Sequence, residues 1–111
     1  MEGVAVANGL ARGTWIVIMI ITPVRNEYEE AAVRGYMKGP HFAYHKGYRK
    51  KGTHSWAVTH VDSGMSVGTG MTRTQAMQFA EYCRDHVDPC MVSDAEVRAQ
   101  LQMKRTEIRG F

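Results

Sequence analysis

The sequence lacks the features that define several classes of protein. Its 111 residues include only two cysteines, Cys83 and Cys90, which cannot form the disulfide framework of a small secreted domain and lack the C-x-x-C spacing of a zinc knuckle. The apolar run at residues 15–21, WIVIMII, is far shorter than the roughly 20 residues of a transmembrane helix. With three prolines and 44% hydrophobic residues, the chain is instead predicted to form one small cytoplasmic domain without a membrane segment.

Motifs of catalysis are lacking as well. Four of the five histidines lie between residues 41 and 60, but no Asp or Glu occurs from residue 31 to residue 61, so a metal site would need a carboxylate such as Asp62 or Asp85. No serine lies in a G-x-S-x-G turn, and Cys83 falls on the apolar face of a predicted helix, where a thiolate is disfavoured. We therefore expect no catalytic residue, no metal and no cofactor. A metal-dependent enzyme that uses the histidines is the distant alternative.

Hydrophobic periodicity predicts an α+β domain with the order (β)αβββαα, in which helices cover one face of a small antiparallel sheet of three or four strands. The expected elements are a buried strand at residues 15–21, a helix from Pro23 to about residue 35, strands at 42–48, 54–61 and 65–69, a helix from Thr72 and a short helix after Ser93.

Local motifs support the second half of this prediction. Asp62-Ser63-Gly64 is typical of a tight hairpin turn, and T-x-x-Q at residues 72–75 and S-x-x-E at residues 93–96 are typical of capping boxes. The apolar periods of the strand and of the following helix predict a core that contains Trp56, Val58, Phe79, Ala80 and Cys83.

The ends of the chain are expected to lie outside this domain. Residues 1–14 are predicted to be an unstructured leader without a function, residues 15–104 the single domain and residues 105–111 a polar tail. Met1 and Met19 are equally acceptable as the native start, and a chain that begins at Met19 is expected to fold and bind as the full chain does.

Positive charge and aromatic residues gather in the middle of the chain. Residues 31–61 contain six lysines and arginines and no acid, and aromatic side chains are interleaved with them, a composition typical of a surface that meets a polyanion. The alternative is a basic hairpin whose lysines only deter edge-to-edge aggregation. The residues expected to contact a partner are Tyr44, Lys46, Tyr48, Arg49, Lys50, Lys51, His54 and Arg73.

Part of the chain resembles a double-stranded-RNA-binding domain. Residues 22–87 have about that family's length, and residues 68–80, GTGMTRTQAMQFA, are similar to its G-x-G-x-S-K-K-x-A-K-x-x-A signature. The resemblance implies an α-β-β-β-α fold in which His54 contacts the minor groove and Arg73 a phosphate. Two further lysines of the family's signature are replaced here by the uncharged Thr74 and Met77.

A second, looser resemblance is to small accessory proteins of bacteriophages, many of which inhibit host defence. Residues 55–83, SWAVTHVDSGMSVGTGMTRTQAMQFAEYC, resemble their strand, turn, strand and helix. This resemblance implies a non-enzymatic inhibitor or adaptor, for example an anti-CRISPR protein, which acts as a monomer or homodimer on a bacterial protein or nucleoprotein complex in the host cytoplasm. A module that binds nucleic acid directly is the alternative.

Overall fold

The computed structural model describes residues 15–110, which form an α+β fold with the element order βββββαα. Five antiparallel strands follow one another both in the sequence and in the sheet. The elements are β1 (Ile16–Val24), β2 (Glu27–Lys38), β3 (Phe42–Lys46), β4 (Trp56–His60), β5 (Met65–Met71), α1 (Arg73–His86), the short 3-10 turn η2 (Pro89–Met91) and α2 (Ala95–Arg109).

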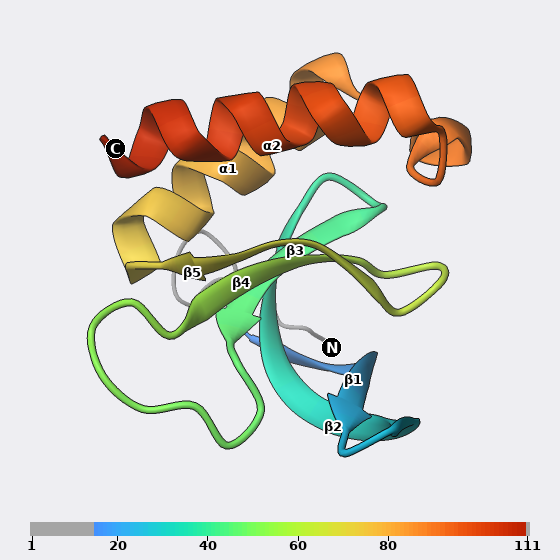
Figure 1. The fold of residues 1–111 in the computed structure, drawn as a ribbon, viewed down its shortest axis with the longest axis vertical. Coiled ribbons are helices and arrows are strands. Elements are labelled where there is room, and N and C mark those ends of the chain that lie inside the picture. The colour runs from blue at the N-terminus through green and yellow to red at the C-terminus, as the bar shows by residue number, and fades with distance from the viewer. Residues whose placement is uncertain (1–14, 111) are drawn as a thin grey trace, which may run out of the picture.

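The sheet curls into a half-barrel. Figure 1 shows α1 and α2 on one side of β3, β4 and β5, and the hairpin of β1 and β2 on the other side. The backbone N–H of Ile21 donates to the carbonyl of Gly64 at 2.8 Å, so the first strand reaches the turn that precedes the last one. Both faces of the central strands are therefore covered.

The helix expected from Pro23 to residue 35 is wrong, because these residues belong to a β-hairpin. Strands β1 and β2 pair from Ile16↔Gly35 to Val24↔Glu27, around a two-residue turn in which Arg25 has a positive φ of 58°. Gly35 is a poor helix former, but the strand needs it because an added Cβ would lie 2.8 Å from the Ile18 side chain. The order of the elements thus departs from the α-β-β-β-α order of a double-stranded-RNA-binding domain.

The expected strand at residues 15–21 exists, but it is not buried throughout. Ile18 and Ile20 are buried, whereas Val17, Met19 and Ile21 are exposed. This alternation arises because β1 is an outer strand of the curled sheet and only its concave face is covered. The other three expected strands are confirmed to within two residues at each end.

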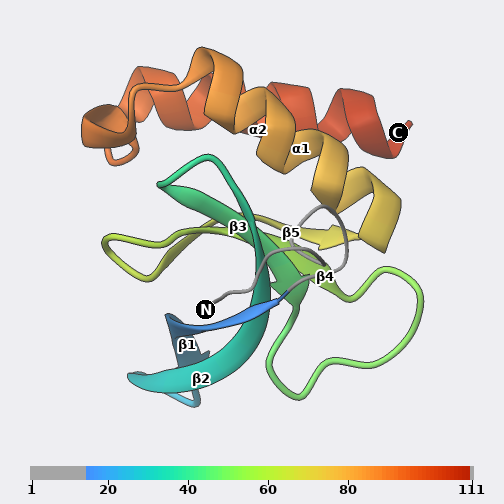
Figure 2. The same ribbon diagram turned by 180° about the vertical axis from the view of Figure 1, so that it is seen from behind.

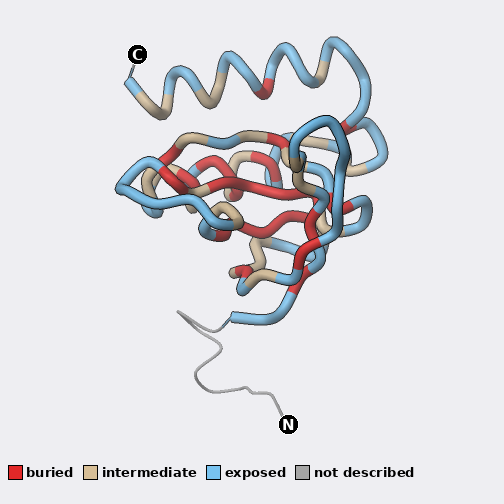
Figure 3. The backbone as a smooth tube through the Cα atoms, turned by 60° about the horizontal axis from the view of Figure 1, so that its bottom comes forward, coloured by how far each residue is buried: buried red, intermediate tan, exposed pale blue. Residues whose placement is uncertain are grey.

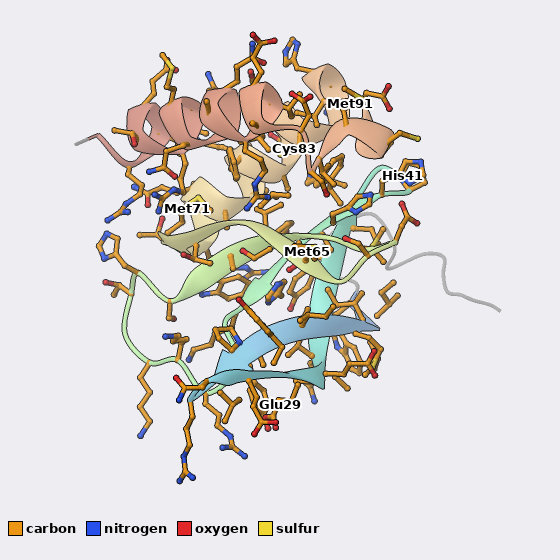
Figure 4. The ribbon with its side chains drawn as sticks, turned by 45° about the vertical axis from the view of Figure 1, so that its right-hand side comes forward. Glu29, His41, Met65, Met71, Cys83 and Met91 are labelled. Carbon is orange, nitrogen blue, oxygen red and sulfur yellow. The ribbon has the colours of Figure 1, made fainter. Side chains whose placement is uncertain are left out.

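Two apolar clusters pack on opposite faces of β3. The larger lies beneath the helices and includes the expected core residues Val58, Phe79, Ala80 and Cys83, all fully buried, with Trp56 only partly buried at its edge. The smaller consists of Ile18, Ile20, Ala31 and Ala43 and lies inside the curl. Figure 3 shows the resulting buried stretches in the middle of the molecule, and Figure 4 places Cys83 at the helices.

The start of α1 agrees with the prediction from the sequence, whereas both ends of α2 differ from it. The capping box of Thr72 and Gln75 is confirmed at the start of α1. The box expected at Ser93 is wrong, because the side chain of Asp94 accepts from the backbone of Glu96 and Val97 and caps α2. Residues 105–109, which the sequence places in a polar tail, continue α2, and Arg105 donates to the carbonyl of Thr69 on β5 at 2.8 Å.

Only part of the N-terminal segment discussed above belongs to the residues that the structure describes. The expected leader, residues 1–14, lies outside the described residues. Residues 16–18, which a start at Met19 would remove, belong to β1. Among residues 15–110 no helix is both long and apolar enough to cross a membrane.

Candidate binding site at the basic loop

Residues 47–55 connect β3 to β4, and we call them the basic loop. Backbone hydrogen bonds hold it: Gly47 donates to Ser55 O at 2.7 Å and Lys50 donates to Gly47 O at 3.1 Å. The buried Ser55 hydroxyl donates to Gly52 O at 2.7 Å. A side chain at position 47 is excluded, because its Cβ would lie 2.7 Å from Lys50 and 3.1 Å from Ser55 O. The loop therefore has a defined shape, and Figures 1 and 2 show that it projects away from the helices.

Tyr48 and Arg49 lie in the first turn of the loop. Tyr48 is half-buried and packs against the smaller apolar cluster, and the Arg49 guanidinium lies over its ring, 4.9 Å from the ring centroid. Arg49 has a φ of 60°, a left-handed backbone conformation that glycine adopts more readily than arginine. The fold thus holds an exposed arginine on an aromatic platform at a position where local backbone preference disfavours it.

The other predicted loop residues lie around this pair. Lys46 at the end of β3, Lys50 and Lys51 are exposed, as is His54, whose Nδ1 lies 3.1 Å from the Thr53 hydroxyl. Four cationic side chains thus lie within six consecutive residues, 46–51. The structure brings Lys46, Tyr48, Arg49, Lys50, Lys51 and His54 together in one connection between strands.

Tyr44 and Arg73 lie elsewhere. Tyr44 is 7% exposed and faces the helices, where it stacks on Tyr36 with ring centroids 5.2 Å apart. Arg73, at the start of α1, lies over the rings of Tyr36 and Trp56 at 5.1 and 5.5 Å. The strand expected at residues 42–48 would place Tyr44 and Tyr48 on one face, because they are four residues apart. This is wrong: β3 ends at Lys46, and Tyr48 packs on the other side of the sheet.

A cavity of about 500 Å³ lies beside the basic loop, inside the curl of the sheet. Its walls come from the second half of β1, from β3, β4 and β5, and from residues 47–50 of the loop. Sequence reasoning missed this cavity, because residues 23–35 were assigned to a helix and the curl needs the β1–β2 hairpin. The signal that could have revealed it is the alternation of Ala31, Val33 and Gly35, which face the same side of β2.

His45 and Thr59 lie at the cavity and hold each other. His45 is 2% exposed, its Nδ1 lies 2.9 Å from Lys46 O, and its Nε2 lies 2.7 Å from the Thr59 hydroxyl. Burial lowers the pKa of His45, so the imidazole is neutral near pH 7. The carbonyl can only accept, so Nδ1 carries the proton and Thr59 donates to Nε2. The N–H of His45 and the hydroxyl hydrogen of Thr59 are therefore both donated within the protein.

His41 and His60 stabilise a turn at the other end of β3. His41 Nδ1 and His60 Nε2 lie 2.6 and 3.3 Å from the same oxygen of Asp62, and His60 Nδ1 lies 2.8 Å from the Ser63 hydroxyl. Figure 4 labels His41, which is partly buried. Among residues 15–110 no three His, Cys, Asp or Glu side chains are placed to hold a metal ion. These contacts instead fix the predicted Asp62-Ser63-Gly64 turn, in which Gly64 has a φ of 77°.

Comparison with protein-family models, with curated proteins and with solved structures gave no match to this chain.

Proposed function

We propose that this chain is a non-enzymatic binding protein, an inhibitor or adaptor of the bacteriophage type, which acts through its basic loop on a bacterial complex that handles nucleic acid. The observation that carries the proposal is the combination of Tyr48 and Arg49 within the run of four cations at residues 46–51. These cations are complementary to an acidic protein surface of such a complex, or to the phosphates of the nucleic acid that it holds.

Three properties of the loop support a recognition role over a solubilising one. Its backbone is fixed by hydrogen bonds, so little conformational entropy is lost on binding. Arg49 occupies an unfavourable backbone conformation, and such strain is concentrated at functional sites. Tyr48 and Arg49 are also residue types enriched at the centres of protein interfaces.

A protein partner is favoured over bare single-stranded nucleic acid because the aromatic residues of the basic segment 31–61 do not form an exposed stacking platform. Tyr44 is buried, and Arg73 covers the rings of Tyr36 and Trp56. Proteins that bind single strands stack bases on exposed aromatic faces, whereas only Tyr48 accompanies the loop cations here.

The test begins with titration of the protein against duplex RNA and single-stranded DNA at two salt concentrations, and against the complex recovered from bacterial lysate. With the complex, we expect Tyr48→Ala to weaken binding by about 2 kcal/mol or more, and Lys50→Ala to slow association with a smaller loss. The thermal midpoints of both variants show whether the Tyr48 effect includes partial unfolding, because this side chain also packs inside the curl.

The decisive variant replaces Arg49, Lys50 and Lys51 by Glu. Its matched control makes the same change of charge on the helices, at Arg84, Arg98 and Lys104. Loss of binding in the loop variant alone supports the proposal, and binding that survives the loop reversal refutes it. Tight binding to bare nucleic acid, weakened by salt with about one unit of log–log slope per phosphate contact, would instead identify a direct nucleic-acid-binding module.

A further inference from the structure

The cavity inside the curl has the size and lining of a small-molecule site. Its volume of about 500 Å³ lies within the roughly 300–1,000 Å³ of typical ligand pockets. Ile20, Pro23 and Val24 of the first strand form one wall, and Ala57 of β4 lies on the other side. Such walls favour the apolar body of a ligand over water.

The rim of the cavity carries positive charge. Arg49 and Lys50 line it and are exposed, and no acidic residue is among the residues that line it. The Arg49 guanidinium is held over the ring of Tyr48, which also lines the cavity, so one charge has a defined place at the rim. An anionic group at this position would gain charge-assisted hydrogen bonds from the guanidinium.

His45 and Thr59 offer no hydrogen to an anion. The N–H of His45 is donated to Lys46 O and the hydroxyl hydrogen of Thr59 is donated to His45. A carboxylate or phosphate placed against this pair would lose its hydration without finding a donor there, which is unfavourable. The charged end of a ligand is therefore disfavoured at His45 and Thr59, whereas the charged groups of Arg49 and Lys50 favour it at the rim.

We propose that this cavity binds a small amphipathic anion, with an apolar body between β1 and β4 and a phosphate or carboxylate group at Arg49 and Lys50. The site goes beyond the macromolecular contact proposed for the basic loop. It shares Arg49 and Lys50 with that contact, but does not use Lys46 or Lys51, which do not line the cavity.

Calorimetric titration of the full chain with four probes tests whether binding needs both the apolar body and the anionic group. The probes 1-naphthyl phosphate and decanoate each combine an apolar body with an anion, 1-naphthol lacks the anion, and inorganic phosphate lacks the body. We expect one-to-one binding of at least one amphipathic probe, with 1-naphthol and inorganic phosphate weaker by about tenfold or more. Binding of naphthyl phosphate alone indicates an aromatic phosphate as the natural type, and binding of decanoate alone an aliphatic carboxylate.

Variants separate the cavity from the loop surface. Val24→Trp fills the cavity from β1 and keeps every charge. If this variant has a lowered midpoint of thermal unfolding, Thr69→Trp is used in its place, because Thr69 is an exposed residue that lines the cavity from β5. Either should abolish binding of the probes while leaving the macromolecular partner bound. Arg49→Gln with Lys50→Gln should weaken the anionic probes about tenfold, whereas the matched control, Lys46→Gln with Lys51→Gln, should not.

The proposal is overturned if neither amphipathic probe binds, if 1-naphthol binds as tightly as 1-naphthyl phosphate, or if a folded cavity-filling variant keeps its affinity for the probes. Failure of this proposal can be told apart from failure of the proposed function. Cavity filling is tested with the small probes, whereas charge reversal at Arg49, Lys50 and Lys51 is tested with the macromolecular complex.

Discussion

At the scale of single residues, His45 illustrates how its surroundings set its chemistry. The sequence places it among four histidines in a basic segment. In the structure it is buried against Thr59 and the backbone of Lys46, and burial lowers its pKa. It therefore contributes a neutral wall to the cavity and no charge to the loop.

This buried histidine makes folding stability depend on pH. Below the ordinary histidine pKa of about 6.5, the unfolded chain takes up a proton at His45 that the folded chain resists, so this group lowers the free energy of unfolding as pH falls below that value. We expect urea unfolding at pH 5.5 to show lower stability than at pH 7.5, and His45→Gln to show a smaller difference between the two pH values. An unchanged difference in that variant would mean that another group is responsible.

Arg49 adopts a backbone conformation that is unfavourable for arginine. Because a left-handed arginine costs roughly 1 kcal/mol and glycine adopts this conformation freely, Arg49→Gly should leave the free energy of unfolding unchanged or raise it by up to about 1 kcal/mol. The same variant should weaken partner binding. Arg25→Gly is the matched control, since Arg25 has a similar φ of 58° outside the basic loop. A clear loss of stability in Arg49→Gly would contradict the strain argument.

At the scale of elements, α1 is held on the sheet by an aromatic ring that fits over a glycine. Phe79 is fully buried, and a Cβ at Gly68 of β5 would lie 2.5 Å from its ring. Phe79→Ala should therefore cost about 3–5 kcal/mol, and Gly68→Ala about 1–3 kcal/mol through overpacking. The double variant Gly68→Ala with Phe79→Leu should cost less than the sum of Gly68→Ala and Phe79→Leu measured singly, as chemical denaturation can show. Additive costs would place the ring away from Gly68.

The elements differ in how far their sequences determine them. The start of α1 could be predicted because Thr72 and Gln75 satisfy each other locally, whatever the rest of the chain does. The second strand could not, because Glu27, Glu29 and Glu30 resemble the acidic first turn of a helix. Their strand conformation depends on pairing with β1, a tertiary interaction that overrides the weak helical spacing.

The same limit applies to the candidate site. Its loop was recognisable, because charge and aromatic residues are contiguous in the sequence. Its cavity was not, because Val24, His45 and Ala57 come together only when the sheet curls. The side of the sheet on which Tyr48 packs likewise depends on where β3 ends. If the strand is assumed to continue beyond Lys46, its alternation places Tyr48 on the wrong face.

At the scale of the whole molecule, the first strand is part of the fold. A chain that starts at Met19 loses Ile18, which is 3% exposed and pairs with Val33. Contrary to the expectation from the sequence, we expect this truncation to lower the free energy of unfolding by at least about 2 kcal/mol, as loss of a buried isoleucine does. A chain that starts at Trp15 is the control and should retain the full midpoint of thermal unfolding. Equal midpoints for the two truncations would refute the structural role of residues 16–18.

The serial pairing of the strands also bears on how the chain assembles. Each strand pairs with the next one along the sequence, so most of the sheet can form through short loop closures, which favours rapid folding. The hydrogen bond from Ile21 to Gly64 joins residues that are distant in the sequence, and it needs β1 to β4 and the turn after β4 in place. A folding intermediate that lacks this closure would already possess the sheet and its basic loop, yet it would have no enclosed space for a ligand.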